Sequence, residues 1–465
     1  MTYTRRKFMG TLSCAALGST TMLSSLLNLK AANALVSPTY KMASPQNDYK
    51  ALVCLLLSGG NDSYNMIVPT ENTQYNTYKD IRSNQALNTS DLHRINPLSG
   101  GEFGFHPSMG DVASLFNQGE VAVIANVGTL IEPVTRKLDF VKDINKLPLG
   151  LFSHADQIQQ WQTSVPQDRS ALGWAGKMAD MLRSSNTNTD ISMNISLSGN
   201  NVFQAGNITT EYTITPYGQG SVGIAGYENA SDSFSQIRAQ AVKSLLEQQY
   251  QDVFKQSYAD VIKTSQASHQ LFSTAVSSVS LNTIFSPNPV SQSMAMIAKT
   301  IASRSTLGMN RQVFFVDFPG WDHHDELLNN QAEMLKVVND AMKEFNDAMK
   351  ELGVHDDVTS FMISDFARTL NSNGNGTDHA WGGNVLVMGG SVKGNTFYGN
   401  YPNMITDTIL DFGGGIVIPK VSTDEYFAEL ALWYGVSPSD LSLVLPNINK
   451  FYDTSSSTAP LGFLM

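Results

Sequence analysis

Cysteine is nearly absent from this chain of 465 residues, which contains only Cys14 and Cys54. Cys14 lies in an N-terminal segment that we expect to be removed, so the mature chain retains a single cysteine and no intrachain disulfide can form. Disulfide bridges are therefore excluded as a source of stability outside the cytoplasm. That stability must come from the hydrophobic core and from any bound metal.

Basic residues are also scarce, because 30 Lys and Arg stand against 41 Asp and Glu and give a formal net charge of −11. Binding to nucleic acid needs a basic face for the phosphates, so nucleic acid is not an expected partner. No stretch after residue 34 is apolar for long enough to span a membrane, so we expect no stable span in the mature protein. What is present, 42% hydrophobic and 15% charged residues, is typical of a folded globular protein.

The first 34 residues predict an export signal. Arg5 and Arg6 precede Phe8, a weakly apolar stretch follows, and Ala-Asn-Ala at 32–34 offers a small-residue cleavage site. The paired arginines resemble the twin-arginine type, which carries folded proteins, so we expect the twin-arginine export machinery as a partner and a periplasmic or secreted bacterial location. An ordinary secretory signal or an uncleaved anchor is the alternative. Cleavage would remove four basic residues and no acid, and would lower the net charge from −11 to −15.

Residues 35–465 predict one α/β domain. Short apolar runs at 51–57, 120–125, 311–318, 358–366 and 384–390 indicate strands, and apolar spacing at 154–164, 170–184 and 330–352 indicates helices. Strands that alternate with helices favour a mostly parallel sheet covered by helices on both faces. Residues 190–290 are polar, and we interpret them as an insertion or cap.

The stretch ALVCLLLSGGNDSYNMIVP (51–69) ends a buried strand at two glycines and Asp62. In an open parallel sheet, ligands bind beyond the carboxyl ends of the strands, so Asp62 is placed for chemistry. The alternative is that Asp62 starts an Asx turn or caps a helix.

The segment GWDHHD follows the strand at 311–318. Asp322 and His324 lie two residues apart, so in an extended segment both point the same way and could share one cation. The alternative is a polar helix start without a ligand.

Two further loops carry acids and a histidine. SDFART ends the strand at 358–366 with Asp365, and Arg368 follows one turn later. GTDHAWGG then supplies Asp378 and His379, which suit direct ligation or a supporting pair in which the acid fixes the tautomer of the ring. Asp378 could also be a simple turn residue.

Ser153 in LFSHADQIQQW is the candidate nucleophile, because it stands at the start of a predicted helix whose N–H groups could stabilise an oxyanion. It could equally be an ordinary N-cap.

These motifs, in order, resemble the bacterial family known as domain of unknown function 1501, which is placed in the alkaline phosphatase and sulfatase superfamily. The resemblance covers most of the mature chain: LVCLLLSGGNDSYNMIVP, FHPSM with GEVAVIANVG, SHADQ with GWAGKM, FPGWDHH, ISDFART, GTDHAWGG with VMGG, and PLGFL. It implies an alkaline-phosphatase-like fold with metals at one edge of the sheet.

By the order of superfamily ligands, the resemblance implies the following roles: Asp62 as first aspartate, Ser153 as nucleophile, Asp322 and His324 as an acid and histidine pair, Asp365 as the next acid, and His379 as last histidine. Phe366 departs from the pattern, because two-metal enzymes carry a histidine there. Asp378 and His379 could instead be that pair, which would leave the last histidine missing.

The resemblance and the strand ends together predict an exported metal-dependent hydrolase of phosphate or sulfate esters, with one or two divalent ions (Zn, Mn, Ca or Mg) and a small anionic ester as substrate. One site built from Asp322, His324 and His379 is expected, with Asp62 and Asp365 completing a second, weaker site or binding through waters. Arg368 is expected to pair with a phosphate or sulfate oxygen. The alternative is a non-catalytic exported binding or assembly protein on the same scaffold with a degenerate metal site.

Overall fold

The computed structural model describes residues 49–464 except 135, 138, 141, 142, 144, 145, 225, 226 and 228–231. The predicted signal at 1–34 and the segment that follows it to residue 48 lie outside the described residues. By its contacts the described chain divides into a large unit, residues 49–222 with 271–464, and a small unit, residues 223–270.

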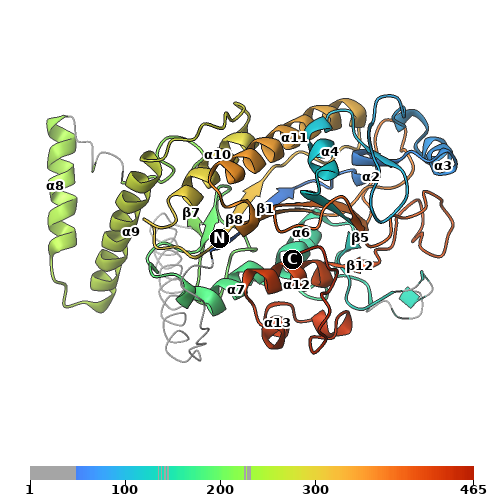
Figure 1. Ribbon diagram of the computed structural model, residues 1–465. Helices are drawn as coiled ribbons and strands as arrows, with labels where there is room; N and C mark the ends of the chain where they lie inside the picture. The colour runs from blue at the N-terminus through green and yellow to red at the C-terminus, as the bar shows by residue number, and fades with distance from the viewer. Residues whose placement is uncertain are drawn as a thin grey trace, which may run out of the picture. The chain divides into compact units, whose positions relative to one another are not determined.

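A nine-stranded sheet runs through the described part of the large unit (Figure 1). Its strand order is β11-β5-β10-β9-β1-β8-β6-β7, and β12 also pairs with β5. Its strands are β1 (Lys50–Leu57), β5 (Val121–Gly128), β6 (Asn194–Ser196), β7 (Tyr212–Thr213), β8 (Arg311–Asp317), β9 (Val358–Ser364), β10 (Gly383–Met388), β11 (Phe397–Tyr398) and β12 (Val421–Ser422). Every pairing in it is parallel except those of β10, which runs antiparallel to β5 and β9. The predicted mixed α/β fold with a large, mostly parallel sheet is confirmed.

Helices cover both faces of this sheet (Figure 1). One layer consists of α4 (Gly110–Asn117), α10 (Pro289–Ala302) and α11 (Leu327–Glu351), and the other of α6 (His154–Thr163), α7 (Trp174–Leu182) and α12 (Thr423–Tyr434). After Lys50, the central strand β1 is apolar, as suits a strand with both faces covered, and residues 51–57 are all buried.

The remaining elements of the large unit are short. Three strands, β2 (Ile67–Pro69), β4 (Phe103–Phe105) and β3 (His93–Ile95), form a small antiparallel sheet. The helices are α2 (Ser63–Met66), α3 (Asn72–Arg82), α13 (Leu441–Val444) and the 3-10 turns Ser83–Gln85, Arg183–Ser185, His355–Asp357, Pro438–Asp440 and Ile448–Lys450.

The segment predicted as an insertion, residues 190–290, divides between the two units. Its first part belongs to the large sheet, because β6 pairs with β8 from Asn194 opposite Val313 to Ser196 opposite Phe315. Residues 223–270 form the small unit, which contains α8 (Ser233–Glu247) and most of α9 (Val253–Ser277). Among the described helices, none combines the length and the apolar character needed to cross a membrane.

Candidate metal centre

The parallel register of the strands brings the loops that follow them to one edge of the sheet. Leu57, the last residue of β1, lies opposite Ser364, the last residue of β9, and Leu56 lies opposite Asp317, the last residue of β8. The three strands therefore end at one level, and the loops that follow them meet there. Because β10 is antiparallel, its first residue lies at the same edge, and the loop before it joins them.

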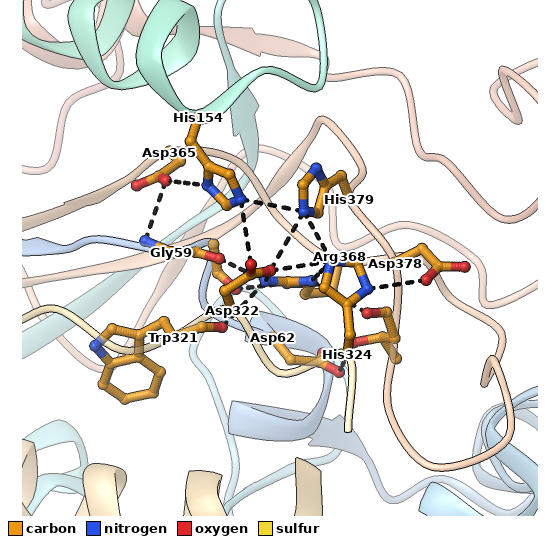
Figure 2. Close-up of polar contacts among 12 residues, drawn as sticks. Gly59, Asp62, His154, Trp321, Asp322, His324, Asp365, Arg368, Asp378 and His379 are labelled. Atoms are coloured by element: carbon orange, nitrogen blue, oxygen red, sulfur yellow. Dashed lines mark hydrogen bonds and ion pairs between the residues drawn. The ribbon is translucent and has the colours of Figure 1, made fainter. Parts of the chain in front are cut away.

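Four side chains from these loops and from the start of α6 converge on one point (Figure 2). His379 Nε2 lies 3.1 Å from His154 Nε2, 2.9 Å from His324 Nε2 and 3.3 Å from Asp322 Oδ1. Asp322 in turn lies 3.1 Å from His324 Nε2 through Oδ1 and 3.5 Å from His154 Nε2 through Oδ2. Donor atoms of His154, Asp322 and His379 all lie within 4.8 Å of one another, so these residues could hold a metal ion. We call these four residues the central cluster.

The opposite ring nitrogen of each histidine contacts an oxygen. His154 Nδ1 lies 2.6 Å from Asp365 Oδ2, and His324 Nδ1 lies 3.1 Å from Asp378 Oδ1. His379 Nδ1 lies 2.9 Å from the carbonyl oxygen of Phe152. Each ring is thus held at its outer edge, with Nε2 directed inward.

Asp365 is the innermost of the acids, because its side chain is fully buried while that of Asp322 is 47% exposed. The Gly59 N–H donates to Asp365 Oδ2 at 3.0 Å, and among the described residues Asp365 Oδ1 has no hydrogen-bond partner. Gly59 has a φ of +120°, and a Cβ there would lie 2.6 Å from the backbone nitrogen of Asp322. Only glycine permits both this conformation and this close approach of two loops.

Arg368 is completely buried beneath the cluster, and its guanidinium is occupied by the protein. It forms an ion pair with Asp322 Oδ1. Four further hydrogen bonds go to the carbonyl oxygens of Gly59, Gly60, Trp321 and Thr377, and Nη1 also lies 3.5 Å from His324 Nε2. Arg368 therefore orients the Asp322 carboxylate, and its donors do not face outward toward a substrate oxygen.

The ionisable groups of the cluster influence one another. The hydrogen bond to Asp365 raises the pKa of His154 above its usual value, whereas burial lowers the pKa of His379. Burial acts to raise the pKa of Asp322, but the hydrogen bond and charge of Arg368 outweigh it, and the pKa is lowered. Asp322 is thus held as a carboxylate, the form that binds cations.

Asp62, expected as the first metal ligand, lies outside the central cluster. Its side chain is fully buried and pairs with the equally buried Arg82 at 2.5 and 2.8 Å. It also caps α2 by accepting from the N–H groups of Tyr64 and Asn65. With Arg82 on both oxygens, the carboxylate has the geometry of the helix-cap alternative.

Ser153 is the N-cap of α6, and its Oγ accepts a hydrogen bond from the Asp156 N–H at 3.5 Å. The contacts of the central cluster come from the next residue, His154. Sequence reasoning therefore chose Ser153 where the structure brings His154 to the cluster. A usable signal was present in the sequence, because His154 is one of five histidines expected in loops, the others being His106, His323, His324 and His379. Of the other four, His324 and His379 join the cluster, while His106 and His323 are buried elsewhere.

Phe366 stands where the resemblance to the alkaline phosphatase and sulfatase superfamily led us to expect a histidine. Its ring packs against two rings of the cluster, with centroids 4.8 Å from His154 and 4.6 Å from His379. Phe366 thus supplies an apolar wall to the imidazoles and no ligand atom.

Comparison with known proteins gives a family but no function. No curated protein matches the sequence. Matching solved structures include Ps i-CgsB and the same protein in complex with k-i-k-neocarrahexaose, at 8% and 9% identity; each has a TM-score of 0.35 and covers 88% of this chain and 78% of the other. A family model described as "Protein of unknown function (DUF1501)" matches residues 49–441.

Proposed function

The chain belongs to the DUF1501 family of proteins of unknown function, and we propose that it is an exported metal-dependent hydrolase of phosphate or sulfate esters. The observation that carries the proposal is the convergence of two imidazoles and a carboxylate, from His154, Asp322 and His379, within 4.8 Å of one another. The ester class rests on the order of the motifs, which resembles that of the alkaline phosphatase and sulfatase superfamily.

The central cluster fits a divalent ion in its chemistry and its exposure. Imidazole nitrogens and a carboxylate oxygen are common ligands for such ions. The side chains of Asp322, His324 and His154 are 47%, 44% and 34% exposed, so solvent and a small ester can reach the centre. When bound, a divalent ion polarises ester oxygens as a Lewis acid and lowers the pKa of water.

The protein's own contribution is to hold the ligands in place. Arg368 fixes one oxygen of Asp322, and the carbonyl groups around the guanidinium keep it from turning outward. Asp365 holds His154 from a fully buried position. These contacts restrict the directions that the ligand side chains can take, which reduces the entropic cost of assembling the site.

We assign the attacking nucleophile to water, because the Ser153 hydroxyl is used as a helix cap. Water adds to the phosphorus or sulfur atom, the bond to the ester oxygen breaks, and the products are the free anion and an alcohol. Ser153→Ala is therefore expected to retain most of the hydrolytic activity, whereas loss of activity would return the serine to the role of nucleophile.

The test is metal analysis of the purified protein combined with assays on an aryl phosphate and an aryl sulfate. We expect bound metal, hydrolysis of at least one ester, and loss of both in Asp322→Asn. Asp325→Asn is the matched control, because Asp325 lies three residues further along the chain and contacts Asn375. Absence of both metal and hydrolysis in the unmodified protein would refute the proposal.

A second candidate function is a non-catalytic exported binding or assembly protein. Two observations favour it. The Asp62 carboxylate is bound by Arg82, and Phe366 stands where the superfamily pattern has a histidine ligand. The second metal site of that pattern therefore lacks two of its ligands. If the gene for Asp322→Ala complements a deletion strain as well as the unmodified gene does, the non-catalytic function is favoured. Failure of a stably folded Asp322→Ala protein favours the hydrolase.

A further inference from the structure

The geometry points to a metal site with three imidazole ligands and one carboxylate, His154, His324, His379 and Asp322, which prefers a transition ion such as Zn²⁺ to Ca²⁺ or Mg²⁺. It rests on the metal dependence in the proposed function and goes beyond it by fixing the ligand set and the class of ion. It replaces the ligand set expected from motif order, in which Asp62 and Asp365 were ligands and His154 was not.

The first step is the tautomer of each ring. The Phe152 carbonyl oxygen can only accept a hydrogen bond, so the proton of neutral His379 lies on Nδ1 and the lone pair on Nε2. The carboxylates of Asp365 and Asp378 have the same effect on His154 and His324. Oxygen acceptors behind ligating histidines are the usual support of a metal site, since they fix the tautomer and the direction of the ring.

The second step is the conflict that this tautomer creates at the centre. Nε2 of His379 faces two other Nε2 atoms, at 2.9 and 3.1 Å, and a carboxylate oxygen at 3.3 Å. All four atoms are acceptors, and acceptors at these separations repel one another unless a cation lies among them (Figure 2). One added proton would bridge one pair of atoms and leave the others facing each other. A single metal ion bound by the three Nε2 atoms and by one oxygen of Asp322 would relieve the repulsion.

Arg368 does not resolve this conflict. Its Nη2 pairs with Asp322 Oδ1, and its Nη1 lies 3.5 Å from His324 Nε2 while donating to the Thr377 carbonyl at 3.1 Å. Asp322 Oδ2 remains directed toward His154 Nε2, at 3.5 Å, and is available to an ion.

The third step is the choice of ion. Three nitrogens and one oxygen suit Zn²⁺ and its neighbours, whereas Ca²⁺ and Mg²⁺ prefer sites built from oxygen alone. Asp365 and Asp378 are then positioning residues that act through the rings of His154 and His324. Asp62 has no part in the site.

The experiment measures metal binding directly. Protein without its predicted signal is stripped with a chelator and dialysed against Zn²⁺, Mn²⁺, Ca²⁺ or Mg²⁺, and bound metal is counted. Co²⁺ titration followed by visible absorption then reports the ligand field. We expect one Zn²⁺ per chain and no stoichiometric Ca²⁺ or Mg²⁺.

Variants test the ligand set. His154→Ala should weaken Zn²⁺ binding by more than 100-fold and change the Co²⁺ spectrum. Asp365→Asn should weaken it by about 10- to 100-fold and retain one ion per chain. His93→Ala is the matched control, because His93 is an exposed histidine that contacts the Pro107 carbonyl, and it should bind Zn²⁺ as the unmodified protein does.

The outcomes separate this inference from the proposed function. Tight Zn²⁺ binding that requires His154, without hydrolysis of either ester, supports the ligand set and refutes the hydrolase. Metal binding that is unchanged in His154→Ala, or that favours Mg²⁺ or Ca²⁺, overturns the ligand set even where the protein hydrolyses an ester. Absence of metal binding overturns both.

Discussion

Asp62→Ala distinguishes a structural from a metal-binding role for the aspartate that ends the first strand. Asp62 and Arg82 are both fully buried, so the substitution leaves the guanidinium without its counter-ion inside the protein. Breaking a buried ion pair from one side costs about 3–5 kcal/mol, and removing the cap of α2 adds about 1 kcal/mol. We therefore expect the free energy of unfolding to fall by roughly 4–6 kcal/mol.

That loss is a large fraction of the typical 5–15 kcal/mol of total stability, so the assay needs a second variant. Urea denaturation followed by tryptophan fluorescence should be measured for Asp62→Ala, for Arg82→Met and for the double variant. The double variant leaves no unpaired buried charge. Its loss in the free energy of unfolding should therefore be smaller than the sum of the losses in the two single variants. Zn²⁺ binding by the folded fraction of each variant should remain unchanged.

The opposite result would refute this reasoning. If Asp62→Ala keeps its urea midpoint but loses metal, Asp62 is a ligand, and the ion pair with Arg82 is not its main role. Additive losses in the double variant would show that the two side chains do not depend on each other.

Three further predictions concern other parts of the chain. Burial raises the pKa of Asp424 to about 7, so between pH 4 and pH 7 the folded protein keeps a proton that the unfolded chain has released. The contribution of this proton to the free energy of unfolding is fully present below pH 4 and is lost as the pH rises through 7, by at most about 4 kcal/mol. Urea denaturation from pH 4 to 8 should show the unmodified protein losing stability relative to Asp424→Asn but not relative to the exposed control Glu247→Gln, and parallel curves would contradict the prediction. Gly59→Ala should abolish Zn²⁺ binding, because its Cβ would meet the backbone at Asp322. The control Gly119→Ala is also at positive φ but has nothing within 4 Å, so it should cost only the backbone strain of about 1–2 kcal/mol and retain Zn²⁺ binding. Equal effects of the two substitutions on Zn²⁺ binding would refute the close-approach argument. Chelation should lower the thermal midpoint and Zn²⁺ should restore it, since free ion at 100 times its Kd contributes about 2.7 kcal/mol, and a midpoint independent of Zn²⁺ would argue against a site in the folded state.

The sheet could be predicted from sequence because its strands are apolar on both faces. The run from Ala51 to Leu57 gave the central strand to within a residue, and the predicted strands at 311–318 and 358–366 correspond to β8 and β9. The same pattern does not reveal strand direction. The antiparallel orientation of β10 depends on its pairing with β5 and β9, which no local pattern encodes.

The location of the candidate site at one edge of the sheet could be predicted from sequence, but its set of residues could be predicted only in part. Acids and histidines after strand ends indicated one edge, and Asp322, His324 and His379 meet there. Asp62 could not be assigned from sequence, because its partner Arg82 lies on α3, twenty residues further along the chain. His154 was not assigned to the site from sequence, because Ser followed by His, Ala and Asp is typical of a helix N-cap and drew attention to Ser153.

The antiparallel direction of β10 has a consequence for how this protein could change. Residues 365–382 leave the sheet after β9 and return to it at the same edge, and Ala367 pairs with Ala380 and Trp381 across this segment as a hairpin does. Asp365, Arg368, Asp378 and His379 therefore lie on one continuous segment of the chain. Exchange of that segment between relatives would replace all four of these side chains in one recombination event.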